Sequence, residues 1–498
     1  MTDHVDVLIV GAGLSGIGAA CHLIDNLPGK TYAILEARDA IGGTWDLFRY
    51  PGIRSDSDMY TLGYRFKPWT NPKAIADGPA ILGYVRETAR EYGVDEHIRY
   101  GYRVLRAEWS TEDALWTVEA EHAGERVTLT TGFLLCCGGY YRYDEGFTPR
   151  FEGIERFAGT VVHPQHWPED LDYAGSRVVV IGSGATAMTL VPAMAPEAAH
   201  VTMLQRSPTY VIARPERDKL ANGLRRVLPG KIAYGLSRAK NVLLQVGNYE
   251  FSQKYPKAAR ALLRLGAVRQ LPDGYPVDTH FRPRYDPWDQ RLCLVPDGDL
   301  FKCLRDGSAE IVTDQIDTFT ETGIRLASGA ELEADVVITA TGLNLVAIGG
   351  MELVVDGRPV SVPETMAYKA MMLSGVPNFA FVFGYTNASW TLKADLVSEY
   401  VCRLLAHLDE HGQRYAVPRP DPSVGERPFT DFAAGYVQRA LADFPKQGDR
   451  HPWRLRMNYL RDVVMLRRGP LDDDAMEFGG AVPPVCTDAP LRSDGAPV

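Results

Sequence analysis

VDVLIVGAGLSGIGAACHLI, residues 5–24, opens the chain with a strand pattern, a glycine-rich turn and a helix pattern in direct succession. The strand residues are apolar apart from Asp6, as in a strand that is buried on both faces. Gly11, Gly13 and Gly16 then fit G-x-G-x-x-G, which allows a tight turn, close approach of a pyrophosphate and packing of the helix on the strand. Because free N–H groups at a helix N-terminus attract phosphate, the stretch predicts a dinucleotide site.

A second strand pattern, YAILE, ends at Glu36, twenty residues after Gly16. A carboxylate at this position hydrogen-bonds a ribose with free hydroxyl groups, as in FAD or NAD. The order strand, turn, helix, strand and acid therefore predicts such a nucleotide in the first site. The alternative is a glycine turn without a ligand.

The pattern recurs in SRVVVIGSGATAMTLV, residues 176–191, where Gly182, Gly184 and Ala187 fit G-x-G-x-x-A. The next strand pattern, HVTMLQRSP, carries Arg206 and Ser207 where an acidic residue would stand. A guanidinium pairs with a 2′-phosphate, which a carboxylate would repel. The second site is therefore predicted to prefer NADPH, the alternative being that Arg206 is a solvated residue at a strand end.

Two such motifs in one chain predict an α/β fold with two Rossmann-like dinucleotide-binding domains, one for FAD and one for NADPH. A hydride can then pass from the nicotinamide to the flavin across the domain interface. FLLCCGGYY, residues 133–141, and DVVITATGLN, residues 335–344, are buried strand patterns that mark where the chain crosses between domains. The expected boundaries are residues 1–145 and 343–498 for the FAD domain, 146–213 and 285–342 for the NADPH domain, and 214–284 for a basic helical insert.

The composition narrows the classes of function. The chain has 498 residues, of which 45% are hydrophobic and 23% charged, as in a globular protein. A net charge of −10 disfavours a nucleic-acid partner. The seven cysteines form no C-x-x-C and no zinc-type spacing, so we expect no metal and the reduced thiols of a cytoplasmic protein. The basic insert leaves peripheral membrane association open, with a solvated helix face as the alternative.

IGGTWDLFRYPGIRSDSD, residues 41–58, follows the first nucleotide motif. Gly43 lets the backbone lie against a cofactor, and Trp45 offers a flat apolar wall. Arg54 and Asp56 stand close behind the turn, and charges near a cofactor are costly to bury unless they are paired. Both are therefore candidate site residues, the alternative being a surface salt bridge.

The spacing of this loop, G-G-x-W-x-x-x-x-Y-P-G-x-x-x-D, resembles that of the type I Baeyer–Villiger monooxygenases. So does FAGTVVHPQHWP, residues 157–168, with the spacing F-x-G-x-x-x-H-x-x-x-W-P. Nearly the whole chain is similar to the mycobacterial, ethionamide-activating subfamily. The resemblance implies an NADPH- and O₂-consuming flavoprotein that converts ketones to esters or lactones through a flavin C4a-peroxide. It also implies oxygenation of sulfur in sulfides and thioamides as a further activity.

The resemblance also assigns roles to residues. Arg291, in WDQRLC, matches the arginine that stabilises the oxygenating intermediate, and Asp56 would hold its guanidinium. The implied FAD contacts are Ser15, Glu36, Thr44, Trp45, Asp46, Leu47, Asp56 and Val104. The implied NADPH contacts are Arg54, Ser55, Asp56, Gly182, Ser183, Gly184, Ala185, Thr186, Ala187, Met188, Arg206 and Ser207.

Two positions qualify this assignment. His163 and Trp167 fall on the linker that couples cofactor binding to domain arrangement, so we interpret His163 as a hydrogen-bonding residue and not a general base; a core histidine is the alternative. Gln290 stands where many members of the family have a lysine that contacts the 2′-phosphate, so the preference for NADPH depends more heavily on Arg206.

Three other classes remain as alternatives. A flavin disulfide reductase needs a redox cysteine pair, for which the adjacent Cys136 and Cys137 are poorly placed. An N- or S-oxygenating flavin monooxygenase and a non-catalytic flavin redox sensor are the others. We expect the tail from about Asp472, which is rich in Asp, Pro and Gly, to be frayed.

Overall fold

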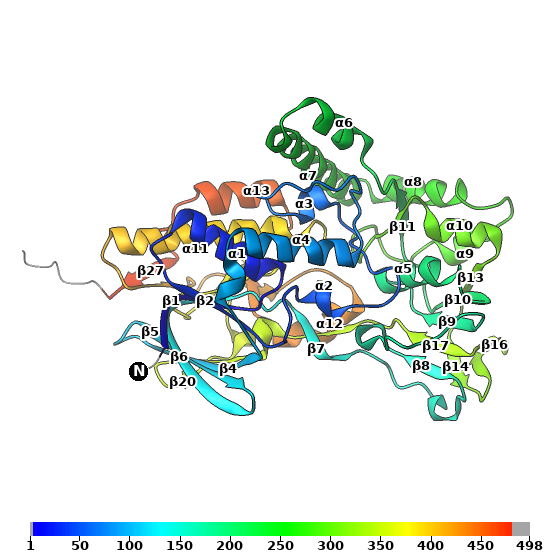
Figure 1. Ribbon diagram of the computed structural model, residues 1–498, viewed down its shortest axis with the longest axis horizontal. Coiled ribbons are helices and arrows are strands. Elements are labelled where there is room, and N and C mark those ends of the chain that lie inside the picture. The colour runs from blue at the N-terminus through cyan, green and yellow to red at the C-terminus, as the bar shows by residue number, and fades with distance from the viewer. Residues whose placement is uncertain (1–2, 481–498) are drawn as a thin grey trace, which may run out of the picture.

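The computed structural model describes residues 3–480, which form two sheets built around parallel strands, with helices packed against them (Figure 1). The nine-stranded first sheet lies at one end of the molecule and the five-stranded second sheet at the other. In order across the first sheet, the strands are β20 (Arg358–Pro359), β19 (Glu352–Val355), β4 (Tyr102–Ser110), β5 (Leu115–His122), β6 (Glu125–Cys136), β1 (Asp3–Val10), β2 (Tyr32–Glu36) and β3 (Ile98–Tyr100), with β23 (Phe379–Phe381) paired to β6.

Strand β1 has the two-sided burial that its apolar sequence predicts. It pairs in parallel with β2 and β6, and alternate side chains enter different cores. Val7 and Ile9 pack in the core that contains helices α1 (Leu14–Asn26), α4 (Gly78–Glu91) and α11 (Trp390–Glu410), whereas Leu8 packs in the core beneath β4 and β5. This central position places the first glycine turn at the carboxyl edge of the sheet, where nucleotides bind in such folds.

The second sheet is entirely parallel and contains the strand of the second glycine motif at its centre. Helices α5 (Ala185–Met194) and α10 (Asp299–Asp306) pack together beside it in one hydrophobic core. Its strands, in order, are β13 (Ala309–Thr313), β10 (His200–Gln205), β9 (Arg177–Ile181), β17 (Val336–Thr339) and β8 (Thr160–Val162). A separate antiparallel sheet follows, with β14 (Ile316–Phe319), β15 (Gly323–Leu326) and β16 (Glu331–Glu333).

The chain passes between the two sheets through an antiparallel pair, β7 (Tyr141–Gly146) and β18 (Leu343–Leu345). Each strand follows one of the buried, glycine-ended strand patterns, so the two crossings lie beside each other. The domain boundaries drawn from the sequence stay a prediction, whereas the two crossings are observed.

Four helices lie between β11 (Val211–Arg214) and β12 (Cys293–Pro296), which pair in parallel. The helices α6 (Lys219–Val227) and α7 (Gly230–Lys254) project from the body at the top of Figure 1. They are followed by α8 (Pro256–Val268) and α9 (Val277–His280). The predicted insert is therefore helical.

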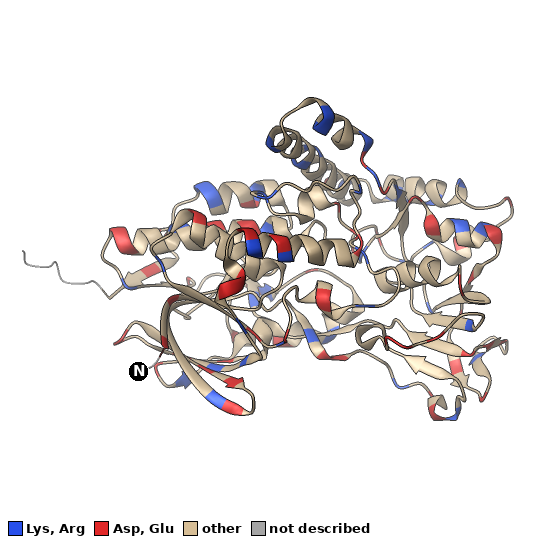
Figure 2. Ribbon diagram, viewed as in Figure 1, with Lys and Arg blue, Asp and Glu red and all other residues tan. Residues whose placement is uncertain are grey.

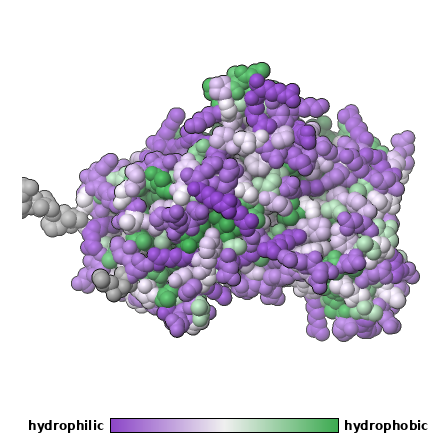
Figure 3. All heavy atoms as spheres, viewed as in Figure 1, coloured by the Kyte–Doolittle hydropathy of each residue, from purple (hydrophilic) through white to green (hydrophobic). Residues whose placement is uncertain are grey.

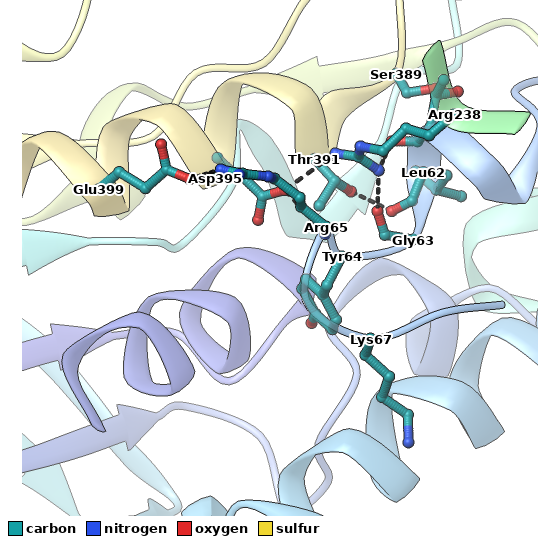
Figure 4. A network of polar contacts seen from close by, with 12 residues as sticks. Leu62, Gly63, Tyr64, Arg65, Lys67, Arg238, Ser389, Thr391, Asp395 and Glu399 are labelled. Atoms are coloured by element: carbon teal, nitrogen blue, oxygen red, sulfur yellow. Dashed lines mark hydrogen bonds and ion pairs between the residues drawn. The ribbon is translucent and has the colours of Figure 1, made fainter. Parts of the chain in front are cut away.

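We call the part of the protein built around the first sheet the first unit, and the part built around the second sheet the second unit. A buried arginine fastens α7 to the first unit (Figure 4). Arg238 Nη2 donates to Asp395 Oδ2 of α11 at 3.0 Å, and its Nη1 donates to the carbonyl oxygens of Tyr60 and Gly63 at 2.8 and 2.7 Å. These residues belong to α3 (Met59–Leu62) and the turn after it. The other Asp395 oxygen lies 3.2 Å from His22 Nε2 of α1. Since the guanidinium and carboxylate are buried and hydrogen-bonded to each other and to neighbouring groups, the contact is specific and not just apolar packing.

The remaining α-helices and strands of the described chain are short, and several strands form separate two-stranded sheets. They are α2 (Thr44–Leu47), α12 (Gly435–Ala440), α13 (Tyr459–Val463), β21 (Ala367–Tyr368), β22 (Met372–Leu373), β24 (Tyr415–Pro418), β25 (Glu426–Pro428), β26 (Lys446–Gly448) and β27 (Met476–Gly479). The expectation of a frayed tail from Asp472 is wrong up to residue 479, because β27 pairs with β24. Residues 481–498 of that tail lie outside the described residues.

Candidate active site

A cavity of about 680 Å³ lies between the two glycine turns and is lined by residues of both units. The first unit contributes Gly11, Gly13 and Glu36, and the second contributes Ala185 and Thr186. The predicted residues on its lining are Gly11, Gly13, Ser15, Glu36, Gly43, Thr44, Trp45, Arg54, Ser55, Asp56, Val104, Ala185, Thr186 and Arg291. A single space thus joins the two predicted nucleotide sites.

The first glycine turn is packed too closely to carry side chains. Gly11 has φ +102°, and a Cβ there would lie 2.8 Å from the carbonyl oxygen of Cys137. A Cβ on Gly16 would lie 1.9 Å from the carbonyl oxygen of Gly11. Gly16 therefore brings α1 against β1, as its place in the motif predicts, without lining the cavity.

The N-terminus of α1 opens on the cavity. Its N-cap is Gly13, which supplies no side-chain hydrogen bond to the first turn. Trp390, at the start of α11, donates from Nε1 to Ser15 Oγ at 2.7 Å and also lines the cavity. The backbone N–H groups of this turn therefore remain available for an anionic group.

Glu36 has a second role that the motif does not predict. Its Oε2 accepts a hydrogen bond from the Ala12 amide at 2.7 Å, and its Oε1 accepts from the Arg38 amide at 2.9 Å. Burial raises the pKa of Glu36, while the two amides lower it. Glu36 thus holds the glycine turn in place as well as facing the cavity.

The four residues of α2 divide between the cavity and the protein interior. Thr44 and Trp45 line the cavity, whereas Asp46 is buried and Leu47 packs against the core of the second unit. Asp46 Oδ2 accepts a hydrogen bond from Arg38 Nη2 at 2.8 Å. We therefore infer that Asp46 acts on this site through Arg38, which does line the cavity.

Asp56 and Arg291 meet at the cavity although 235 residues separate them. Arg291 Nε donates to Asp56 Oδ2 at 2.6 Å, and its Nη2 contacts the same oxygen. The Asp56 carboxylate raises the pKa of Arg291 above its already high ordinary value. The pair therefore presents a permanent guanidinium cation in a defined position.

The same loop makes a second ionic contact with the other unit. Arg54 Nη1 donates to Asp299 Oδ2 at 2.5 Å, and its Nη2 lies 3.4 Å from the carbonyl oxygen of Met188. Ser55, between the two charged residues, is buried and its Oγ accepts from the Ser57 amide at 2.9 Å. The charges at residues 54 and 56 are thus paired across the units and do not form local surface bridges.

The second glycine turn resembles the first in geometry. Gly182 has φ +138°, and a Cβ there would lie 2.3 Å from the carbonyl oxygen of Ala340. Gly184 is the N-cap of α5, again without a side-chain hydrogen bond to the helix. Ala185 and Thr186 continue onto the cavity lining, so this helix also presents its free N–H groups toward it.

The other residues predicted for this site lie away from the lining. Ala187 and Met188 are buried in the core, and Ser183 Oγ lies 2.9 Å from Thr209 Oγ1 and 3.1 Å from the Ser207 carbonyl oxygen. Arg206 and Ser207 are exposed at the end of β10. Within residues 3–480, Arg206 has no ion-pair partner, so its guanidinium is free to meet a phosphate.

His163 is held by the backbone on both ring nitrogens. Its Nδ1 accepts from the Gln165 amide at 3.2 Å, and its Nε2 lies 3.1 Å from the carbonyl oxygen of Gly342. This arrangement requires the neutral ring with the proton on Nε2, and burial lowers the pKa of His163 accordingly. Trp167 is partly buried against the second core. Both residues therefore sit at the crossing between the units and not on the cavity lining.

Comparisons with known proteins now place the chain. One family model, described as flavin-binding monooxygenase-like, matches residues 70–224, and another, described as an NAD(P)-binding Rossmann-like domain, matches residues 9–69. The FAD-containing monooxygenase EthA of Mycobacterium tuberculosis is 59% identical over 487 residues, which are 97% of this chain and 100% of that protein. The chain belongs to the family of FAD-containing monooxygenases.

Other relatives and solved structures agree with this placement. The probable FAD-binding monooxygenase AlmA of Acinetobacter baylyi is 49% identical to this monooxygenase over 96% of the chain and 97% of that protein. Steroid monooxygenase bound to NADP has a TM-score of 0.73 at 23% identity, covering 96% of this chain and 99% of that one. The open structure of cyclohexanone monooxygenase has a TM-score of 0.74 at 21% identity, covering 96% and 100%. The predicted fold with two dinucleotide-binding units is confirmed.

Several residues of the monooxygenase cavity were missed at the sequence level. Tyr140, Tyr141 and Tyr143 line it. The hydroxyl oxygen of Tyr143 lies 3.4 Å from Thr44 Oγ1. Arg38 lies over the Tyr143 ring at 5.9 Å. The available signal was the run of aromatic residues directly after the glycines that end the first crossing strand.

Residues 3–480 contain no group of three or more His, Cys, Asp or Glu side chains arranged to hold a metal ion. No helix in that range combines the length and apolar composition needed to span a bilayer.

Proposed function

We propose that this monooxygenase is a Baeyer–Villiger enzyme that uses FAD, NADPH and O₂ to convert ketones to esters or lactones. One oxygen atom of O₂ is inserted beside the carbonyl carbon, and the other leaves as water with the two electrons that NADPH supplies. Oxygenation of sulfur in sulfides and thioamides is a second proposed activity of the same cavity. The observation that carries the proposal is the Asp56–Arg291 pair on a cavity that both nucleotide units line.

The residues present fit both cofactors. Gly11 leaves no room for a side chain, Gly13 lines the cavity without one, and α1 opens on this cradle without a capping side chain. Gly184 and the start of α5 repeat this arrangement on the second unit. When bound, the flavin supplies the oxygen-activating redox centre and NADPH supplies the hydride that reduces it.

Arg291 provides the charge that this reaction needs. An oxygen nucleophile that attacks a ketone must remain anionic, and a fixed cation stabilises that negative charge. Arginine keeps its proton at ordinary pH, and Asp56 fixes the direction of the guanidinium. Burial raises the pKa values of the neighbouring Tyr140 and Tyr141, so both stay neutral and add no competing anion.

Arg206 is the proposed reader of the NADPH 2′-phosphate. It is exposed beside the second glycine turn, and its guanidinium can form two parallel hydrogen bonds with a phosphate. Gln290 adds no charge at the position where a lysine would assist. We therefore propose a preference for NADPH that a single arginine largely determines.

The test measures ester formation and peroxide release together. The flavin-loaded protein is reduced with NADPH without oxygen, then mixed with O₂ and a panel of cyclic, linear and aryl ketones plus sulfides. We expect ester or lactone in proportion to the NADPH consumed, with hydrogen peroxide as a minor product. Sulfoxide as the only oxygenated product would favour a sulfur-oxygenating enzyme. Release of all electrons as peroxide, with every ketone and sulfide, would refute the proposal.

A further inference from the structure

Helix α7 has a reversed distribution of polarity. Its solvent side carries Ile232, Leu236, Leu243, Leu244 and Phe251, spaced so that they share one broad face of the helix. Three of these side chains are highly exposed: Ile232 at 54%, Leu243 at 60% and Leu244 at 53%. A helix that merely covers a soluble core would turn this apolar side inward.

The opposite side of α7 faces the protein and mixes core residues such as Tyr234 and Val242 with polar side chains. Ser237 and Arg238 are buried there, and Gln245 Nε2 donates to Asp58 Oδ2 at 2.9 Å. Arg238 is held by Asp395 and by backbone carbonyl oxygens, as Figure 4 shows. Because these specific hydrogen bonds define which side faces inward, rotation of α7 cannot hide its apolar side.

Helix α6 extends the apolar surface. Leu220 and Val227 are 59% and 77% exposed, and α6 packs against α7 at the projecting tip of the molecule. Figure 3 shows hydrophobic atoms gathered at this tip, next to hydrophilic ones. We call Leu220, Val227, Ile232, Leu236, Leu243, Leu244 and Phe251 the α6–α7 apolar face.

Positive charge surrounds this face. Residues 219–269 contain eleven Lys and Arg and a single acidic residue, Glu250, so this segment carries +10 in a chain of net charge −10. Figure 2 shows Lys and Arg along α6 and α7. Lys219, Arg226 and Lys231 are exposed near the tip and form no ion pair within residues 3–480. The rest of the chain therefore carries −20. Within residues 3–480, Arg238, Lys240, Arg260 and Arg264 of this segment pair with aspartates, so the charge beside the exposed apolar side chains comes from unpaired cations such as Arg226 and Lys231.

We infer that the α6–α7 apolar face docks on an anionic lipid bilayer. Its leucine, isoleucine, valine and phenylalanine side chains would enter the boundary between headgroups and acyl chains, with Arg226 and Lys231 at the phosphate level. A two-fold contact between identical faces of two copies would bring two strongly cationic segments together, which charge repulsion opposes. Charge complementarity thus favours a bilayer over a second copy.

The test is sedimentation of the full-length, flavin-loaded protein with lipid vesicles. Vesicles of phosphatidylcholine alone are compared with vesicles that also contain phosphatidylglycerol, at low and high salt. The protein is expected to pellet with the anionic vesicles at low salt and to be released as salt screens the cations. Binding does not depend on ketone turnover, so its failure is independent of the proposed oxygenation.

Two paired variants separate charge from apolar insertion. Arg226→Gln/Lys231→Gln is expected to lower partitioning into anionic vesicles roughly 30-fold. Leu236→Gln/Leu243→Gln should lower it at least about tenfold, because two side chains no longer enter the bilayer. Val161→Gln and Lys302→Gln are matched controls, since both residues are exposed outside this face and should change binding less than about twofold.

Specific outcomes would overturn the inference. One is a folded, flavin-loaded protein that stays in solution with anionic vesicles at low salt. Another is vesicle binding that the leucine variant leaves unchanged. A third is a dimer that light scattering detects in the wild type and that the leucine variant dissociates, which would assign the face to a second copy.

Discussion

Replacement of Arg291 by alanine should separate reduction of the flavin from oxygenation of the ketone. The guanidinium is the permanent cation that Asp56 holds at 2.6 Å on the cavity lining. A unit charge about 4 Å from a developing anion contributes about 4 kcal/mol at an effective dielectric constant of about 20. Loss of one such preorganised group typically costs 10²- to 10³-fold in rate. We therefore expect ester formation to fall about 10²- to 10³-fold, with hydride transfer from NADPH little affected.

The pair also makes the double variant informative. Arg291→Ala leaves Asp56 as an unpaired carboxylate on the cavity, which adds repulsion toward an anionic oxygen. Asp56→Asn keeps the cation but removes its strongest partner, and we expect a loss of about tenfold from misdirection of the guanidinium. The double variant should be no slower than Arg291→Ala, because removal of Asp56 no longer matters once its partner is absent.

Two assays distinguish the steps. Anaerobic stopped-flow absorbance follows flavin reduction, and steady-state turnover with simultaneous ester and peroxide measurement follows the use of oxygen. Arg291→Ala should keep its reduction rate and convert most NADPH consumption into peroxide. If this variant forms ester at the wild-type rate and yield, Arg291 does not supply the charge and the proposed mechanism fails.

Three further predictions address the cofactor turns and the crossing between units. Gly11→Ala should purify with little flavin absorbance because its Cβ would approach the Cys137 carbonyl oxygen to 2.8 Å, whereas Gly29→Ala, with no atom within 4 Å, should retain flavin; equal flavin content would contradict the cradle. Arg206→Ala should raise the KM for NADPH about 10- to 100-fold, corresponding to about 1.5–3 kcal/mol, and leave that for NADH nearly unchanged; a parallel change in both would exclude a 2′-phosphate contact. Calorimetry should show that His163→Ala unfolds at a lower temperature than the wild type at pH 7.5. The difference between the two unfolding temperatures should be smaller at pH 5.5. The folded-state pKa of His163 is lowered, so its stabilisation is complete above about pH 6.5 and is lost as the pH falls; a difference that widens at low pH would contradict the neutral ring.

Backbone constraints made much of the fold predictable. Gly11 and Gly182 have φ of +102° and +138°, which only glycine adopts without strain, so their signature is local and appears directly in the sequence. The two-sided burial of β1 likewise follows from its unbroken apolar pattern. The described part of the tail was misjudged because β27 is short and depends on a distant partner, β24, which composition does not reveal.

Side-chain partners were less predictable, because they depend on contacts between distant segments. Asp46 falls on a cofactor position by resemblance, yet it is buried beside Arg38 at 2.8 Å. The Asp56–Arg291 pairing came from the family resemblance and not from spacing along the chain. In the sequence, Arg238 is one of many charges in the basic helical insert. In the structure, it lies in a buried network with Asp395.

The loop at residues 54–56 connects the charge of the cavity with the arrangement of the two units. Arg54 bonds Asp299 and Asp56 bonds Arg291, and both partners belong to segments that lead into or out of the second sheet. The two bonds emerge from one short stretch of the first unit, so they cannot lengthen independently when the units move. A displacement that separated Arg54 from Asp299 would also pull on the Asp56 carboxylate and change the direction of the Arg291 guanidinium. The position of the proposed catalytic cation therefore depends on how closely the second unit is held against the first.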